Sequence, residues 1–252
     1  MSKYVIIDAH LHLWKKQQGM VNGRPVVGVG DGKSYFGGEV RQMMPPYMND
    51  DENTVERLIA NMNYACVNGC VVTQEYIDGN QDAYLLESKD KFPDRIKICS
   101  LYEEKPSFLL EGADGVKICA GRLKDKDLKI AIGHFGMVTT PGWQKQIALA
   151  KHKNVYIESG GLTWLFHKEF YPYPSAIDAI LEARDICGMD KLMWGSDYPR
   201  TMTDITYIMA VRFIAESDKL TDAEKRAFLG ENAVKFYGFG EMVPMKAIPN
   251  ML

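Results

Sequence analysis

The residues best suited to chemistry are two histidines near the start of the chain, in the segment 8–12, Asp-Ala-His-Leu-His. They follow an apolar run, residues 4–7, that predicts a short buried strand. Side chains two apart on a strand point to the same face, so His10 and His12 should project together, with Asp8 on their side. Neutral imidazole is the commonest metal ligand in proteins. The pair is therefore a candidate site for a metal ion or a polarised oxygen; the alternative is two histidines that merely cap a strand.

Composition places the chain among ordinary globular proteins. It has 252 residues, of which 46% are hydrophobic and 25% charged. This length suits one large α/β domain or two small ones, and α/β barrels often reach it as single domains. The formal net charge is −3, and no basic run suggests a nucleic-acid partner. No apolar stretch approaches the ~18 residues of a membrane helix. A small-molecule substrate is the expected partner, and the chain is a possible homo-oligomer.

The cysteines indicate a reducing compartment. There are five, an odd number without the spacing of a secreted disulfide framework. Cys70, Cys99 and Cys119 each lie in an apolar run, as expected of small buried side chains. The chain enters its first strand almost at once, without a signal-peptide pattern. A cytoplasmic location is therefore expected.

Strand patterns alternate with helical patterns along the chain, which predicts parallel strands joined by crossover helices. We find no internal repeat and no linker, so residues 1–252 are expected to form a single domain. A long irregular segment, residues 15–52, follows the first strand and contains many glycines; loops of this length are usually functional, often lids. The expected strands are 1–12, 70–75, 96–101, 115–119, 128–132, 155–158 and 191–194, and the expected helices are 53–65, 82–91, 143–151, 175–187, 205–216 and 221–229.

This alternation predicts a TIM-like (β/α)₈ barrel, but one strand is missing from the count. Such a barrel needs eight strands, and seven are recognisable. The link after the fourth strand is only residues 121–127, whereas a parallel crossover takes about a dozen residues or more. The barrel should therefore be distorted, with the fifth βα unit absent or shortened.

Catalytic groups of such barrels lie at the carboxyl ends of the strands, and the polar residues follow this rule. His10 and His12 end the first strand, His134 ends the strand at 128–132, and Asp197 ends the last. Three histidines and an aspartate suit zinc, whose catalytic sites leave one position open for water. Further polar residues on the same rim are Gln74, Glu75, Lys117, Glu158 and Arg200.

Four motifs resemble those of the amidohydrolase superfamily, in its amidohydrolase-related branch of lactonases and decarboxylases. The segment 8–14 resembles the branch's first-strand motif, and 132–136 is similar to its sixth-strand His-x-Gly segment. The segment 194–199, Trp-Gly-Ser-Asp-Tyr-Pro, resembles its eighth-strand signature, and 231–238 its closing helix. All four occur in the family's order and span nearly the whole chain.

The resemblance implies a distorted barrel that holds one divalent metal, expected to be Zn²⁺. His10, His12 and Asp197 are then metal ligands, and Asp197 is also the base that activates water. His134 is either a further ligand or the group that polarises the substrate carbonyl. Many members carry another ligand histidine on the fifth strand, which this chain does not show, and some lactonases of the branch work without metal.

The resulting hypothesis is a hydrolase that opens a lactone of a small polar acid or sugar acid. A metal-dependent non-oxidative decarboxylase on the same scaffold and a non-catalytic ligand-binding barrel are the alternatives. Substrate-binding candidates are Lys117, Glu75, Arg200 and Arg41, since cations suit a carboxylate and the rim faces the substrate. Their ordinary alternatives are a salt bridge for Lys117 and loop solvation for Arg41. Glu158 is a candidate partner that orients a histidine.

Overall fold

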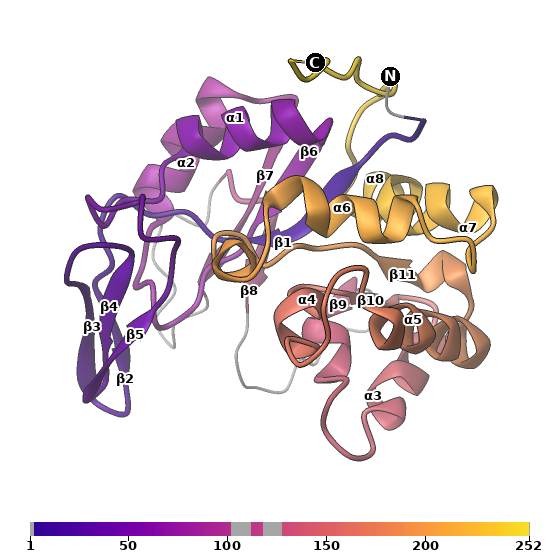
Figure 1. The fold of residues 1–252 in the computed structure, drawn as a ribbon, viewed down its shortest axis with the longest axis horizontal. Coiled ribbons are helices and arrows are strands. Elements are labelled where there is room, and N and C mark those ends of the chain that lie inside the picture. Colours follow the sequence, from indigo (N-terminus) through magenta and orange to yellow (C-terminus); the bar gives the residue numbers. More distant parts are fainter. Residues whose placement is uncertain (1–2, 102–111, 118–127, 252) are drawn as a thin grey trace.

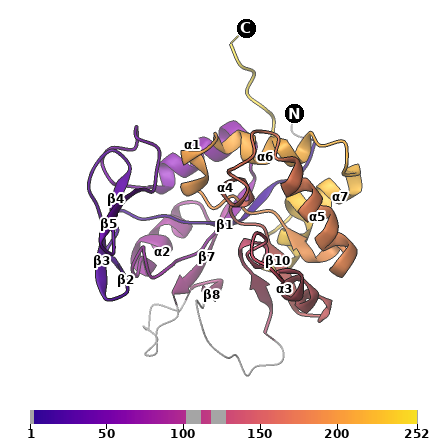
Figure 2. The same cartoon turned by 60° about the horizontal axis from the view of Figure 1, so that its bottom comes forward.

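A computed structural model describes residues 3–101, 112–117 and 128–251. Two parallel sheets form its centre, with the strand orders β1-β6-β7-β8 and β11-β10-β9. Helices surround them, and β1 lies near the middle of the molecule (Figures 1 and 2). The central strands are β1 (Ile7–Leu11), β6 (Gly69–Val72), β7 (Ile96–Leu101), β8 (Gly115–Lys117), β9 (Ile130–Ile132), β10 (Val155–Glu158) and β11 (Leu192–Met193).

Backbone hydrogen bonds join the two sheets between β1 and the segment after β11. Ala9 N donates to Trp194 O at 2.9 Å, and His12 N donates to Tyr198 O at 2.9 Å. Leu11 and Tyr198 also form a parallel bridge. The seven strands thus form one continuous parallel array in the order β8-β7-β6-β1-β11-β10-β9. This is the order of a TIM-like barrel whose gap falls between β8 and β9.

Within the described residues no strand fills the fifth position of the barrel, and no closed ring of strands is formed. The part of the chain that would supply it, residues 118–127, lies outside the described ranges. The predicted strand end at 118–119 lies there too. The fold is therefore TIM-barrel-like, with an arc of seven strands.

Helices occupy the outside of the arc, as the alternating pattern predicts. The apolar stripe of α1 faces inward, with Leu58 and Met62 fully buried. A capping box begins the last helical region, because Thr221 and Glu224 each bond the other's backbone. The α-helices are α1 (Val55–Ala65), α2 (Asp82–Lys91), α3 (Gln144–Ala148), α4 (Leu162–Leu165), α5 (Pro174–Cys187), α6 (Tyr207–Ala215), α7 (Asp222–Arg226) and α8 (Asn232–Tyr237).

Shorter helical turns complete the connections. A π-helical segment joins α7 to α8, and 3₁₀ turns flank α3 and α5. These turns are η2 (His134–Gly136), η3 (Leu149–Lys151), η4 (Met189–Lys191), η5 (Arg200–Thr203) and the π segment η6 (Ala227–Glu231). None of the helices among the described residues has the length and apolar character needed to cross a membrane.

The expectation of an irregular segment at 15–52 is wrong. This segment forms an antiparallel meander, which we call the insert, built from β2 (Gly19–Val21), β3 (Arg24–Gly28), β4 (Lys33–Phe36) and β5 (Glu39–Gln42). Five of its glycines lie in the turns between strands with positive φ, which glycine adopts at little cost. The insert stands to one side of the parallel array (Figure 1). A pair of backbone hydrogen bonds between Trp14 and Asn53, at 2.9 and 3.0 Å, closes its base.

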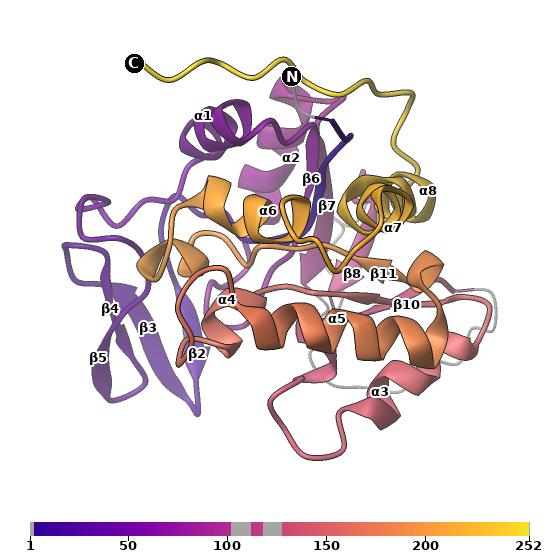
Figure 3. The same cartoon turned by 45° about the vertical axis from the view of Figure 1, so that its right-hand side comes forward.

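The chain ends in an extended tail. Residues 239–251 run across the molecule over α1, as Figure 3 shows. Asn68 Nδ2 donates to Val243 O at 2.8 Å, and Tyr64 OH donates to Asn250 at 3.3 Å. The tail is thus fixed to the end of the array opposite the carboxyl ends of the strands.

Candidate active site

The structure brings His10, His12 and Asp197 together at the carboxyl ends of β1 and β11, and all three are buried. The distance between the Nε2 atoms of His10 and His12 is 3.2 Å. Asp197 Oδ1 lies 3.0 Å from His12 Nε2 and 3.5 Å from His10 Nε2. Three donor atoms from the two ends of the chain thus form a small triangle.

The Nδ1 atom of each histidine donates a hydrogen bond to a group outside the triangle. His12 Nδ1 donates to Thr73 O at 3.1 Å, because a carbonyl oxygen can only accept. His10 Nδ1 donates to Glu158 Oε1 at 2.6 Å. These bonds direct the Nε2 lone pairs of the neutral rings toward each other and toward Asp197, the arrangement that surrounding partners impose on metal-binding histidines. Glu158 therefore has the orienting position expected from the sequence.

The edges of the triangle lie within about 0.3 Å of those expected for a zinc site. Ligand atoms about 2.0–2.2 Å from a tetrahedral zinc ion lie about 3.3–3.6 Å from one another. The three separations here are 3.0, 3.2 and 3.5 Å. Two lone pairs and a carboxylate oxygen at this spacing repel one another unless a cation lies between them. The donor set therefore fits a divalent ion.

Charge around His12 strengthens this conclusion. Burial tends to lower the pKa of its imidazole, but Asp197, Asp78 and Glu75 raise it to about 9. Burial tends to raise the pKa of Asp197, but the His10 and His12 rings hold it well below its usual range. The site therefore attracts a cation, either a proton on His12 or a metal ion in its place.

Asp197 has an unusual backbone conformation that directs its carboxylate into the triangle. Its φ is 60°, in the left-handed region where aspartate and asparagine are tolerated better than most residues. Its N–H donates to His10 O at 2.8 Å, which ties this turn to β1. Trp164 Nε1 donates to Asp197 Oδ2 at 2.6 Å. One carboxylate oxygen thus faces the histidines while the other is held by an indole from α4.

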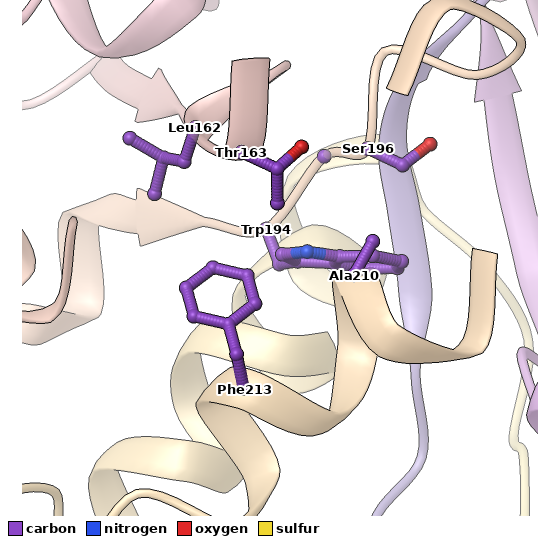
Figure 4. Close-up of a pocket in the computed structure, with 7 residues that line it drawn as sticks. Leu162, Thr163, Trp194, Ser196, Ala210 and Phe213 are labelled. Atoms are coloured by element: carbon purple, nitrogen blue, oxygen red, sulfur yellow. The ribbon is translucent and has the colours of Figure 1, made fainter. Parts of the chain in front are cut away.

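Gly195 in the eighth-strand motif permits this close approach. A Cβ atom there would lie 2.8 Å from His10 Cβ, so any larger residue would push the first strand away. Next to it, Trp194 packs on Ala210 and Phe213 of α6, and Thr163 closes the other side (Figure 4). This space does not admit a water molecule. These side chains pack together to support the site, and the space between them is not a substrate pocket.

His134 lies beside the triangle. Its ring centre is 4.7 Å from that of His10, and its Nδ1 donates to Gly160 O at 2.8 Å. Its Nε2 faces Glu75 Oε1 at 3.9 Å. Burial tends to lower the pKa of His134, but Glu75, Asp197 and Glu158 raise it to about 9. At neutral pH this side chain is therefore an imidazolium.

The turn that carries His134 is strained. Residues 134–137 all have φ between 51° and 61°, and left-handed backbone costs about 1–2 kcal/mol for each non-glycine residue. Phe135 is fully buried and packs against Trp143 and Phe228. This packing holds the turn in place. Strain of this kind is common where a side chain must be aimed at a site.

Asp8 does not share the histidine face as the alternation of β1 predicted. The pairing of β1 with β6 is irregular between Asp8 and Leu11, which breaks the simple two-residue period. Asp8 accepts hydrogen bonds from the N–H and hydroxyl of Ser196 at 2.9 and 2.5 Å and from Tyr207 OH at 2.8 Å. Burial raises its pKa to about 6, although these bonds oppose the shift. Its position is structural, directly under the Asp197 turn.

Of the four substrate-binding candidates, the structure places Glu75 and Arg200 beside site residues and Arg41 on the insert. Glu75 joins the site through His134. The Arg200 guanidinium lies over the Trp164 ring, 4.1 Å from its centre, next to the indole that holds Asp197. Lys117 ends β8 beside Leu101, but its side chain lies outside the described part of the structure. Arg41 is exposed on β5, where it pairs with Glu39 and stacks on Phe36; the structure does not bring it to the histidines.

A cavity of about 430 Å³ opens between loops on the carboxyl side of the strands. Its wall includes four tyrosine and phenylalanine side chains and His167. The histidines of the triangle, His134 and Asp197 do not line it. Its aromatic lining consists of Tyr47, Phe170, Tyr171 and Tyr173.

Sequence reasoning missed two residues of the site. Trp164 is not among the candidates from the sequence, although it bonds Asp197. Asp78 was not considered, yet it is buried with Oδ2 3.4 Å from His12 Nδ1. The available signal was that both residues follow the carboxyl ends of parallel strands, where barrel sites are built.

The fold and the site define a parallel β/α array with a histidine–aspartate centre at the carboxyl ends of its strands. The resemblance to the amidohydrolase-related branch is confirmed, because the family model described as Amidohydrolase matches residues 120–239. That match includes the motifs at 132–136, 194–199 and 231–238. No curated protein matches the chain.

Solved structures show the same fold at low identity. A probable 2-pyrone-4,6-dicarboxylic acid hydrolase from Acinetobacter baumannii, with citric acid bound, is 20% identical with a TM-score of 0.67, covering 93% of this chain and 99% of its own. An amidohydrolase from Burkholderia multivorans with bound zinc is 15% identical with a TM-score of 0.64, covering 94% and 100%. A 5-carboxyvanillate decarboxylase from Novosphingobium aromaticivorans, complexed with manganese, is 14% identical with a TM-score of 0.52, covering 72% and 79%.

Proposed function

We propose that this protein is a hydrolase that opens the cyclic ester of a small polar acid, with a divalent ion held by His10, His12 and Asp197. The supporting observation is the triangle of donor atoms, whose edges of 3.0–3.5 Å lie close to the ligand spacing of zinc. A divalent ion there would supply Lewis acidity for acidifying a water molecule and polarising an ester carbonyl. Zinc is the ion that this donor set and spacing favour.

Asp197 has the position of a general base. Its Oδ1 edge faces the histidines, and its Oδ2 edge is fixed by the Trp164 indole. Burial tends to raise the pKa of Asp197, but contacts with the His10 and His12 rings hold it low. Neutral imidazoles, the form that binds a cation, would lower it less. Asp197 would then take a proton from the attacking water and pass it to the leaving alkoxide as the ring opens.

His134 is suited to stabilise negative charge on the substrate. Its pKa of about 9 keeps it protonated at neutral pH, and its Nδ1–H is already bound to Gly160 O. The Nε2–H is therefore the proton it can offer to the ester carbonyl oxygen. A fixed donor aimed at a developing oxyanion stabilises the transition state more than the ground state.

The substrate class follows from charge and from the related structures. The name of one structural neighbour gives a pyrone dicarboxylic acid as substrate, and that neighbour contains bound citrate; both are small polycarboxylates. In this chain Arg200 lies over Trp164 on the approach to Asp197, and a guanidinium binds carboxylates with two parallel hydrogen bonds. A lactone that carries a carboxylate is accordingly the favoured substrate.

The purified protein should contain or take up one divalent ion per chain and should hydrolyse a lactone from a panel of pyrone dicarboxylates and sugar-acid lactones. The test combines metal analysis with mass spectrometry of the product formed in H₂¹⁸O. One ¹⁸O atom should enter the new carboxylate. Release of CO₂ without ¹⁸O would identify a decarboxylase instead. Undiminished lactone opening after complete metal removal would exclude the ion from the mechanism while leaving the hydrolase intact.

Replacing His134 with asparagine should lower kcat/KM for lactone opening by about 10²–10³-fold, because one donor to the oxyanion is lost. Asparagine also tolerates the left-handed backbone at this position. Zinc affinity, measured in parallel, should stay close to that of the unmodified protein. The matched control is His152→Asn, an exposed histidine on the surface. A large fall in zinc affinity in His134→Asn would instead make His134 a ligand.

A further inference from the structure

The loop after β6, residues 73–78, contributes several groups to the site. Thr73 O accepts the Nδ1–H of His12 at 3.1 Å, and Glu75 faces His134. Asp78 ends the loop, with only 2% of its surface exposed, and its Oδ2 lies 3.4 Å from His12 Nδ1. The buried Asp78 carboxylate thus lies on the Nδ1 side of the His12 ring, and Asp197 lies on the Nε2 side.

The insert holds this loop through its backbone. Gln18 N donates to Asp78 O at 3.2 Å, and Met20 N donates to Tyr76 O at 2.8 Å. The contact is tight at Gly19, where a Cβ atom would lie 2.1 Å from Tyr76 O and 2.3 Å from the carbonyl carbon of Ile77. Only glycine permits β2 to lie this close to the loop. The first strand of the insert thus sets the position of the Asp78 backbone.

The insert also contacts the loop through side chains. Gln81 Nε2 donates both to Lys16 O and to Asp78 O, each at 2.9 Å. Ser34 of β4 donates to Gln17 Oε1 at 2.5 Å in a buried position. These bonds connect the body of the insert with the segment that precedes β2. The meander is therefore attached to the second half of the loop, from Tyr76 to Asp78, and to Gln81 beyond it.

We propose that Asp78 is a positioning residue for His12 and that the insert, through Gly19, holds Asp78 in place for divalent-ion binding. This inference rests on the proposed metal centre. Asp78 places a carboxylate oxygen 3.4 Å from His12 Nδ1, beside the Thr73 O that accepts the Nδ1–H. Its negative charge stabilises this orientation of the ring and makes Nε2 a stronger electron-pair donor to a metal ion. Removing such a partner commonly lowers metal affinity by 10–100-fold.

The test measures Zn²⁺ affinity by competition with a chromophoric chelator. Asp78→Ala should bind zinc about 10–100-fold more weakly, and Asp78→Asn, which keeps an acceptor without the charge, should be intermediate. Gly19→Ala should weaken binding as well. Adding Gly19→Ala to Asp78→Ala should have little further effect, because the two changes act through one contact. Controls are Asp94→Asn, an exposed aspartate, and Gly240→Ala, where an added Cβ meets open space.

A second measurement separates failure of this inference from failure of the proposed function. Nitrogen-15 NMR of the histidine rings reads the Nδ1–H of His12 directly, without any metal. In Asp78→Ala its resonance should shift and its proton should exchange faster with water. Unchanged zinc affinity and an unchanged His12 signal in a folded Asp78→Ala protein would overturn the inference. If the unmodified protein bound no zinc while Asp78→Ala still altered the His12 signal, the metal centre would be wrong and the positioning role of Asp78 would stand.

Discussion

Replacing Asp197 with asparagine should lower kcat/KM for lactone opening by about 10²–10⁴-fold, the usual contribution of a general acid–base group. The substitution changes little else in the backbone, because asparagine accepts the left-handed conformation that Asp197 has. It removes the charge that attracts a cation and leaves only one acceptor oxygen for Trp164 and the metal to share. Zinc affinity should fall in the same variant.

The control for this prediction is Asp218→Asn, which makes the same change in charge at an exposed position. It should leave both rate and zinc affinity unchanged. The Asp197→Asn assay is repeated at saturating zinc, so that loss of the ion is distinguished from loss of the base. Full activity of Asp197→Asn under these conditions would rule out the proposed role of Asp197.

Replacing Asp8 with alanine should destabilise the fold by about 3–5 kcal/mol. Its carboxylate accepts four hydrogen bonds, from the N–H groups of His10 and Ser196 and from the hydroxyls of Ser196 and Tyr207. Each buried donor left without a partner costs about 1–3 kcal/mol. The gain from removing a buried charge, whose pKa is raised to about 6, offsets part of this cost. Urea unfolding monitored by circular dichroism gives the difference.

Asp8→Asn separates hydrogen bonding from charge. Asparagine keeps an oxygen for the two backbone N–H groups, and its amide can donate to the hydroxyls, so the loss should be much smaller than in Asp8→Ala. Asp94→Ala, on an exposed turn, should stay within about 0.5 kcal/mol of the unmodified protein. Equal stability of Asp8→Ala and the unmodified protein would show that the Ser196 and Tyr207 contacts contribute nothing.

Local patterns in the sequence identified most of the elements. The helix at 82–91 and the strand at 96–101 were predicted with the bounds that the structure has, because apolar periodicity and turn residues are set by neighbouring positions. The irregular segment at 15–52 was the main error. Its strands are three to five residues long, mostly exposed or half-buried, and separated by glycine turns, so neither alternation nor burial gives a clear signal.

Part of the candidate site could be predicted, because position relative to the strand ends is visible in the sequence. Sequence patterns pointed to His10, His12, His134 and Asp197 because each lies at or shortly after the carboxyl end of a strand, and parallel strands bring these ends to one edge. Arg41 was a candidate only by residue type, and its strand lies away from this edge (Figure 1). Trp164 and Asp78 were missed because they lie in loops whose path does not follow from local sequence.

The sequence by itself determined that two histidines at the end of the first strand would meet an aspartate after the last, since strand order fixes which ends share an edge. Only the tertiary structure decided how these groups face one another. The bond between His12 and Asp197 spans 185 residues, and its 3.0 Å length depends on Thr73, Glu158 and Trp164 holding the three side chains from behind. Those contacts come from long-range packing, which residue spacing along the chain does not encode.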